Sequence, residues 1–193
     1  MKDYISGHGD PTMVGAVQQF IESKLMSTGR RGIDRVVDFI RASNFYAVGC
    51  CRHHRFAGGM SQHAIETYLY ASAHNTSHIP ESSLIITCLL HDICDISGYS
   101  RYTRHGNRSK RLIEVECGFE LTQSESDAIL HHMHSRHEPD MFGRDYERVT
   151  VDPLWNMIRS ADHYSAGHPL NRYQLYKQIT GNEYQRTHTP PLG

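Results

Sequence analysis

The chain alternates between amphipathic stretches and short polar breaks, a pattern that predicts helices along its whole length. Between Val14 and Leu25 the apolar residues recur at spacings of three and four, which places them on one face of a helix. Asp10-Pro11 precedes this stretch and suits a helix start, because Asp can cap and Pro fits the first helical position. The same spacing returns between Ile33 and Ile40.

The later part of the chain follows the same rule, and we expect no β-sheet. No segment shows convincing strand alternation, and there is no internal repeat or low-complexity tract. We therefore predict an all-α, single-domain helical bundle. Its N-terminal helices, residues 1–51, pack on a core of residues 52–168, and residues 169–193 form a last helix and a frayed tail. Helices are expected at residues 60–73, 81–92, 110–116, 122–132, 152–162 and 170–179, and polar loops at residues 44–59, 97–106 and 134–151.

Composition supports one globular domain and gives few hints of large partners. The 193 residues are 38% hydrophobic and 21% charged, as in ordinary folded proteins. A formal net charge of −1 gives no strong nucleic-acid or membrane signal. No apolar run approaches the roughly 18–20 residues of a membrane helix, and the N-terminus lacks a signal-peptide core, so we expect a cytoplasmic protein. Five cysteines without a C-x-x-C pair argue against a disulfide framework.

Histidine is the anomaly in the composition, with 15 in the chain. The apolar run of residues 84–90 leads directly into His91-Asp92, and a run this apolar is a buried element. Burying an imidazole beside a carboxylate costs free energy unless a partner compensates. A divalent cation compensates both, because neutral imidazole and carboxylate are its ordinary ligands. His63, His105 and Asp162 lie on or beside other helical stretches and are candidates for the same ion site.

The order of these residues resembles the HD-domain family of metal-dependent phosphohydrolases. The resemblance covers roughly residues 52–166 and depends on five short motifs. They are Gly58-Gly59-Met60-Ser61-Gln62-His63, Leu89-Leu90-His91-Asp92-Ile93-Cys94, His105-Gly106-Asn107-Arg108-Ser109, Ala128-Ile129-Leu130-His131-His132 and Ser160-Ala161-Asp162.

The resemblance implies an all-helical fold that holds divalent metal ions. One ion would be bound by His63, His91, Asp92 and Asp162. A second would be bound by His105 and His132, with Asp92 bridging the two and His131 as the fallback for His132. Ligands of this kind suit Mn, Fe, Co, Ni or Zn, with Mg less natural. Two such ions can lower the pKa of a shared water and clamp phosphoryl oxygens.

Other residues of this region are candidates for contact with the substrate. Many family members carry a lysine where this chain has Asp95. That acid either takes a catalytic role beside Asp92 or orients a ligand histidine. Four arginines are candidate phosphate contacts, although a solvated surface charge is the more common role for each: Arg101, Arg104, Arg108 and Arg159.

We therefore expect a metal-dependent phosphohydrolase that acts on a small phosphate ester or nucleotide. A di-iron oxygenase with the same six ligands is one alternative, and a non-catalytic module that senses a nucleotide is another. The sequence leaves open the substrate, the metal and whether the chain forms a homo-oligomer. A zinc cluster at residues 50–54 is disfavoured, because its Cys and His residues are too contiguous for the usual ligand spacing. His54 can still lie near the metal centre, because Gly58-Gly59 turns the chain back toward His63.

Overall fold

The structure, a computed structural model, describes residues 11–50, 53–94 and 105–183, and every regular element in these ranges is a helix. The prediction of an all-α, single-domain protein is confirmed. In chain order the elements are α1 (Pro11–Ser27), α2 (Ile33–Ala42), α3 (Gly59–Ala73), α4 (Glu81–Leu90), α5 (His105–Arg111), the π-helix η2 (Leu112–Glu116), α6 (Gln123–His131), the 3-10 helices η3 (Pro139–Met141) and η4 (Gly143–Asp145), α7 (Tyr146–Val151), α8 (Pro153–Gly167) and α9 (Arg172–Thr180).

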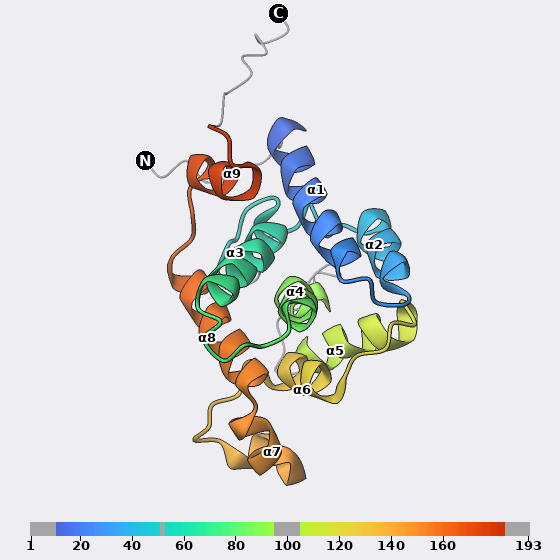
Figure 1. Cartoon of the computed structure of the whole chain (residues 1–193), viewed down its shortest axis with the longest axis vertical. Coiled ribbons are helices and arrows are strands. Elements are labelled where there is room, and N and C mark those ends of the chain that lie inside the picture. Colours follow the sequence, from blue (N-terminus) through green and yellow to red (C-terminus); the bar gives the residue numbers. More distant parts are fainter. Residues whose placement is uncertain (1–10, 51–52, 95–104, 184–193) are drawn as a thin grey trace, which may run out of the picture.

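Helix α4 is the centre of the bundle. Its residues from Leu84 to Leu90 are all buried, as the unbroken apolar run predicts. Four helices pack against it, namely α1, α3, α6 and α8. Figure 1 shows α4 nearly end-on in the middle of the molecule, with these helices around it. His91, Ile93 and Cys94, which follow α4, are buried as well, so this short stretch lies inside the bundle.

The N-terminal helices belong to the same packed body as the rest. Helix α1 contacts α2, α3, α4 and α9, so the first and last described helices lie together. The predicted tail beyond residue 183 lies outside the described residues. Among the helices of the described ranges, none combines the length and apolar character needed to cross a bilayer.

The helix-start signals of the sequence act as predicted. Thr122 caps α6 by accepting a hydrogen bond from the Glu125 backbone N–H, and the Glu125 carboxylate accepts one from the Thr122 N–H in return. Asp152 caps α8 through a 2.8 Å hydrogen bond from the Leu154 N–H. These caps fix where α6 and α8 begin, and both helices carry candidate metal ligands.

Two of the predicted loops are partly helical. Residues 134–151 include η3, η4 and α7, and they bury Phe142 and Val149, which the polar composition of the segment concealed. The sequence predicts a loop at His105, but this residue is the first of α5. Gly106 suggested a turn, yet it serves helix packing: a Cβ on it would lie 2.5 Å from the Leu130 carbonyl oxygen of α6.

The ion pair between Arg30 and Glu125 should be costly to break, because the Glu125 side chain is fully buried. Its carboxylate accepts 2.8 Å hydrogen bonds from the Arg30 guanidinium and the Ser83 hydroxyl. We expect Glu125→Ala to lower the free energy of unfolding by about 2–3 kcal/mol, since it also removes half of the capping box. Urea denaturation would measure this. Glu116→Ala, at an exposed position, should change it by less than about 0.5 kcal/mol, and equal midpoints for both variants would contradict the expectation.

Candidate metal centre

The six predicted ligands meet in one cluster although they come from elements far apart in the sequence. His63 lies on α3 and Asp162 on α8, and the His63 Nε2 is 3.1 Å from the Asp162 Oδ1. His91 ends α4, and its Nε2 lies 3.2 Å from the Nε2 of His63. On the other side, the Nε2 atoms of His105 and His132 are 3.1 Å apart. The fold thus brings together every member of the set that the sequence singled out as metal ligands.

Asp92 stands between the two histidine pairs, with one carboxylate oxygen toward each. Its Oδ2 lies 3.7 Å from the His91 Nε2 and 4.0 Å from the His63 Nε2. Its Oδ1 lies 3.3 Å from the His132 Nε2 and 3.6 Å from the His105 Nε2. This is the arrangement that a carboxylate shared by two neighbouring ions would need.

The helix ends fix which nitrogen two of these histidines present. His91 and His132 are the C-terminal caps of α4 and α6. The His91 Nδ1–H donates to the Cys88 carbonyl at 3.0 Å, and the His132 Nδ1–H donates to the Ile129 carbonyl at 2.7 Å. In a neutral ring the other nitrogen, Nε2, then carries a lone pair. Both lone pairs face the cluster, as metal-binding histidines require.

His63 is held by a hydroxyl instead of a carbonyl. Its Nδ1 lies 2.8 Å from the Ser165 Oγ, which is itself 3.0 Å from the Thr67 Oγ1. Ser165 and Thr67 are buried, so this contact is shielded from water. The side chain of His63 is therefore oriented from behind, with its Nε2 directed at Asp162 and His91.

The residues present fit divalent cations. Each pair of nitrogens that face one another at 3.1–3.2 Å needs either a proton or a metal ion between them, because two lone pairs at that distance would repel. The Asp92 Oδ1 is buried and makes no hydrogen bond within the described residues, so it too lacks a partner that an ion would supply. Two helix C-termini also point their partial negative charge into the cluster. Three overlapping groups drawn from the six predicted ligands bring their ligand atoms within 4.8 Å of one another: His63, His91 and Asp92; His91, His132 and Asp162; Asp92, His105 and His132.

The charges of the ion-free cluster show how strongly these groups interact. Burial alone would raise the pKa of Asp92, but His91, His132 and His105 outweigh it and hold that pKa well below its usual range. Burial likewise opposes a proton on His132, yet the Asp92 carboxylate raises its pKa to about 9. His91, dominated by burial, has its pKa lowered to about 4. Protons on some of the histidines take the place of cations when no ion is bound.

His132, and not the fallback His131, is the member of its pair that reaches the cluster. The His131 Nδ1 instead lies 3.0 Å from the Nδ1 of His134, and its ring stacks on Phe142. Its backbone carbonyl accepts a 2.9 Å hydrogen bond from the Trp155 indole N–H of α8. That bond ties the end of α6 to α8 and so helps to hold His132 beside Asp92.

The predicted substrate contacts are less well placed by the described residues. Asp95, Arg101 and Arg104 lie outside them. Arg108 is exposed on α5. Arg159 is also exposed, with its Nε donating to the His134 carbonyl at 3.0 Å and its guanidinium 5.8 Å from the centre of the Trp155 ring. These contacts of Arg159 are thus with His134, beyond the end of α6, and with Trp155 of its own helix α8, and not with the six ligands.

Sequence reasoning gave little weight to His53, which lies against the cluster. The centre of its ring is 4.3 Å from that of His63, and His54 is 5.2 Å from His63 by the same measure. The turn at Gly58-Gly59 was the available signal, and it indicated only that His54 could lie near the metal centre.

The chain has no match among protein-family models, curated proteins or solved structures. The likeness to the HD-domain family therefore depends on the motifs of the chain alone. What the cluster can do has to be argued from its own geometry and charge.

The affinity of the cluster for metal ions should rise with pH, because His132 has to lose a proton before it can bind an ion. Its pKa of about 9 lies above the ordinary value near 6.5, so the ion-free chain carries that proton at pH 7 and loses it only as the pH passes 9. An ion needs the lone pair, so binding must release the proton. We expect the apparent affinity for Mn²⁺ to increase up to about tenfold per pH unit between pH 6.5 and 8.5, for each proton released.

Calorimetric titrations in buffers of different ionisation enthalpy would count the protons. His132→Gln should make the pH dependence shallower, whereas His137→Ala, at an exposed position, should leave it unchanged. An affinity that is the same across this range, with no proton released, would show that His132 does not bind the ion.

Proposed function

We propose that the chain is a metal-dependent phosphohydrolase that acts on a small phosphate ester or nucleotide. The observation that carries the proposal is the position of Asp92, whose two oxygens face the pairs His63–His91 and His105–His132. Four imidazoles surround the Asp92 carboxylate, and Asp162 adds a second carboxylate beside His63. This arrangement suits two adjacent divalent ions. Mn, Fe, Co, Ni or Zn match these ligands better than Mg, which prefers oxygen.

The residues of the chain would supply a rigid, charged and largely dry site. The carbonyls of Cys88 and Ile129 keep the rings of His91 and His132 in one orientation, so little reorganisation accompanies the reaction. Asp92 stays ionised over the physiological range, since its pKa lies well below its usual value. Bound ions would supply the rest, because they lower the pKa of water and neutralise the charge that develops on phosphoryl oxygens.

Part of the cluster is accessible to solvent, as a site that takes up a substrate must be. The side chains of His63 and His91 are at most 1% exposed, whereas His105 is 19% exposed and Asp92 is 14% exposed. The Asp162 side chain is 12% exposed, and we expect a phosphate group to reach the cluster past His105 and Asp92, its two most exposed members. Arg108 is exposed on the same helix as His105 and stays a candidate contact for that group.

A panel of phosphate monoesters, phosphodiesters and nucleotides, incubated with Mn, Co, Ni and Mg, tests the proposal. We expect hydrolysis of at least one class, and we expect Asp92→Ala to abolish both hydrolysis and metal retention, because one carboxylate serves both histidine pairs. Elemental analysis measures the metal content, and His137→Ala should keep both properties. Oxygen uptake by the iron-loaded protein without phosphate release would instead support a di-iron oxygenase. Nucleotide binding without turnover would support a sensing module.

His105→Ala separates a one-ion centre from a two-ion centre. His105 is the most exposed of the four histidines and belongs to only one of the pairs. Its loss should reduce the metal content from about two ions per chain toward one and lower hydrolysis by orders of magnitude, while the helical circular dichroism is unchanged. Retention of the full metal content in this variant would mean that His105 is not a ligand.

A further inference from the structure

The loop that precedes α3 holds a second pair of histidines in a constrained conformation. His54 has a positive φ of 48°, in the left-handed region that side chains other than glycine rarely adopt. Its carbonyl accepts hydrogen bonds from the backbone N–H groups of Cys50, at 3.2 Å, and Phe56, at 2.8 Å. A Cβ on Gly59 would lie 1.9 Å from the same oxygen. The glycine pair thus allows the loop to press its His54 backbone directly against the start of α3.

A buried carboxylate on α3 orients the ring of His54. The Glu66 Oε2 accepts a hydrogen bond from the His54 Nε2–H at 2.8 Å. The Glu66 Oε1 accepts two more, from the Gln62 amide at 2.7 Å and from the Leu170 backbone N–H at 2.9 Å. With three donors around it, this carboxylate acts as a fixed acceptor. The ring of His54 therefore has its Nε2–H committed to Glu66.

This bond determines the next one. In neutral His54 the Nδ1 must be an acceptor, and it lies 3.1 Å from the Nδ1 of His53. His53 then donates its Nδ1–H, and its Nε2 is left with a lone pair. The hydrogen bonds from Glu66 through His54 to His53 thus determine which nitrogen of His53 carries the lone pair. The helix-end carbonyls do the same for His91 and His132.

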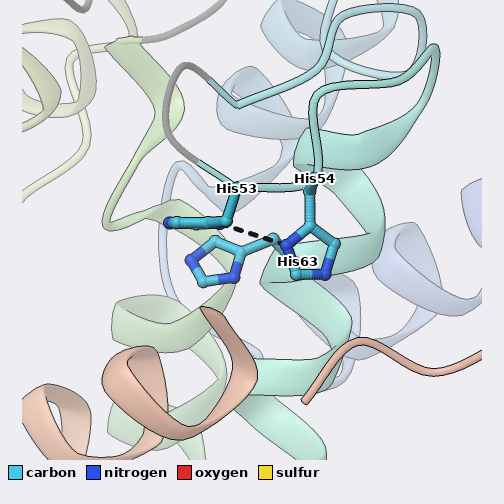
Figure 2. A group of neighbouring side chains, drawn as sticks. All are labelled: His53, His54 and His63. Carbon is cyan, nitrogen blue, oxygen red and sulfur yellow. Dashed lines mark hydrogen bonds between the residues drawn. The ribbon is translucent and has the colours of Figure 1, made fainter. Parts of the chain in front are cut away.

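The lone-pair nitrogen of His53 lies on the same side as the His63 nitrogen that is directed at the cluster. In Figure 2 the ring of His53 lies across that of His63, with its bond to His54 at one end. The nitrogen at its other end points to the same side as the far nitrogen of His63. That nitrogen of His63 is the one directed at Asp162 and His91.

His53, His54 and His63 do not form a separate ion site of their own, although their ligand atoms lie within 4.8 Å of one another. Both ring nitrogens of His54 are engaged, by Glu66 and by His53. Both nitrogens of His63 are engaged as well, by Ser165 and by the Asp162 side of the cluster. Of the three, His53 has an Nε2 that takes part neither in the bond to His54 nor in the bond between His54 and Glu66.

We propose that His53 is a further ligand of the metal centre, on the side of His63, His91 and Asp162, and that Glu66 and His54 position it. This assignment depends on the proposed metal centre but not on what the centre hydrolyses. It gives the loop residues 53–59 a function. It also explains why the buried Glu66 on α3 accepts hydrogen bonds from three donors.

Cobalt binding tests the assignment without any substrate. We expect His53→Ala to weaken one of the two Co²⁺ binding steps by roughly ten- to hundredfold and to change the visible absorption of the bound Co²⁺. Glu66→Gln should weaken the same step by a smaller factor, because it disturbs the orientation of His53 and not its nitrogen. The step assigned to His105 and His132 should be unaffected in both variants.

His137→Ala is the matched control and should bind Co²⁺ as the unaltered chain does. Circular dichroism confirms folding, and His53→Gln replaces His53→Ala if the alanine variant unfolds. Unchanged Co²⁺ affinity and spectrum in the His53 variant would overturn the assignment. If the unaltered chain binds Co²⁺ but hydrolyses no phosphate ester, the proposed function is wrong. The Co²⁺ affinity and spectrum of the His53 variant still decide the His53 assignment.

Discussion

Four buried or half-buried imidazoles turn their nitrogens toward two carboxylates at the end of α4, and the rest of the structure depends on neutralising that concentration of electron pairs. Protons can do this in part, which is why the pKa of His132 rises to about 9 in the ion-free chain. Divalent ions do it better, since each satisfies several ligands at once. The packing of α3, α5, α6 and α8 around the centre serves to hold these side chains against their mutual repulsion.

The position of α4 explains how a short motif comes to lie among the candidate metal ligands. The apolar residues of α4 are buried on all sides, and the burial continues past its last turn to His91 and Ile93, so the His91-Asp92 pair lies in the interior. The free carbonyls of that last turn would be costly there, and His91 satisfies one of them with its Nδ1–H. The same bond points its Nε2 at the other ligands. One hydrogen bond thus both satisfies the helix end and orients the candidate ligand, and the same bond recurs at His132, the C-cap of α6.

Much of this could be predicted from sequence because the signals are local. The apolar run before His91, the capping box at Thr122 and the Asp152-Pro153 start are properties of adjacent residues, and each element formed where expected. The wrong predictions concern residues whose positions depend on tertiary packing. Gly106 resembled a loop glycine but permits close contact with α6, and Phe142 is buried by neighbours that its own polar segment does not reveal. The orientation of His53 depends on Glu66, thirteen residues away, and no spacing rule shows it.

Anomalous diffraction from crystals grown with Mn²⁺ is the most direct test of a two-ion centre bridged by Asp92. The geometry predicts two peaks, one near His63 and His91 and the other near His105 and His132, with one Asp92 oxygen toward each. Their separation should be roughly 3.5–4 Å. A single peak at saturating Mn²⁺, or two peaks that leave Asp92 uncoordinated, would contradict the two-ion centre and the mechanism that depends on it.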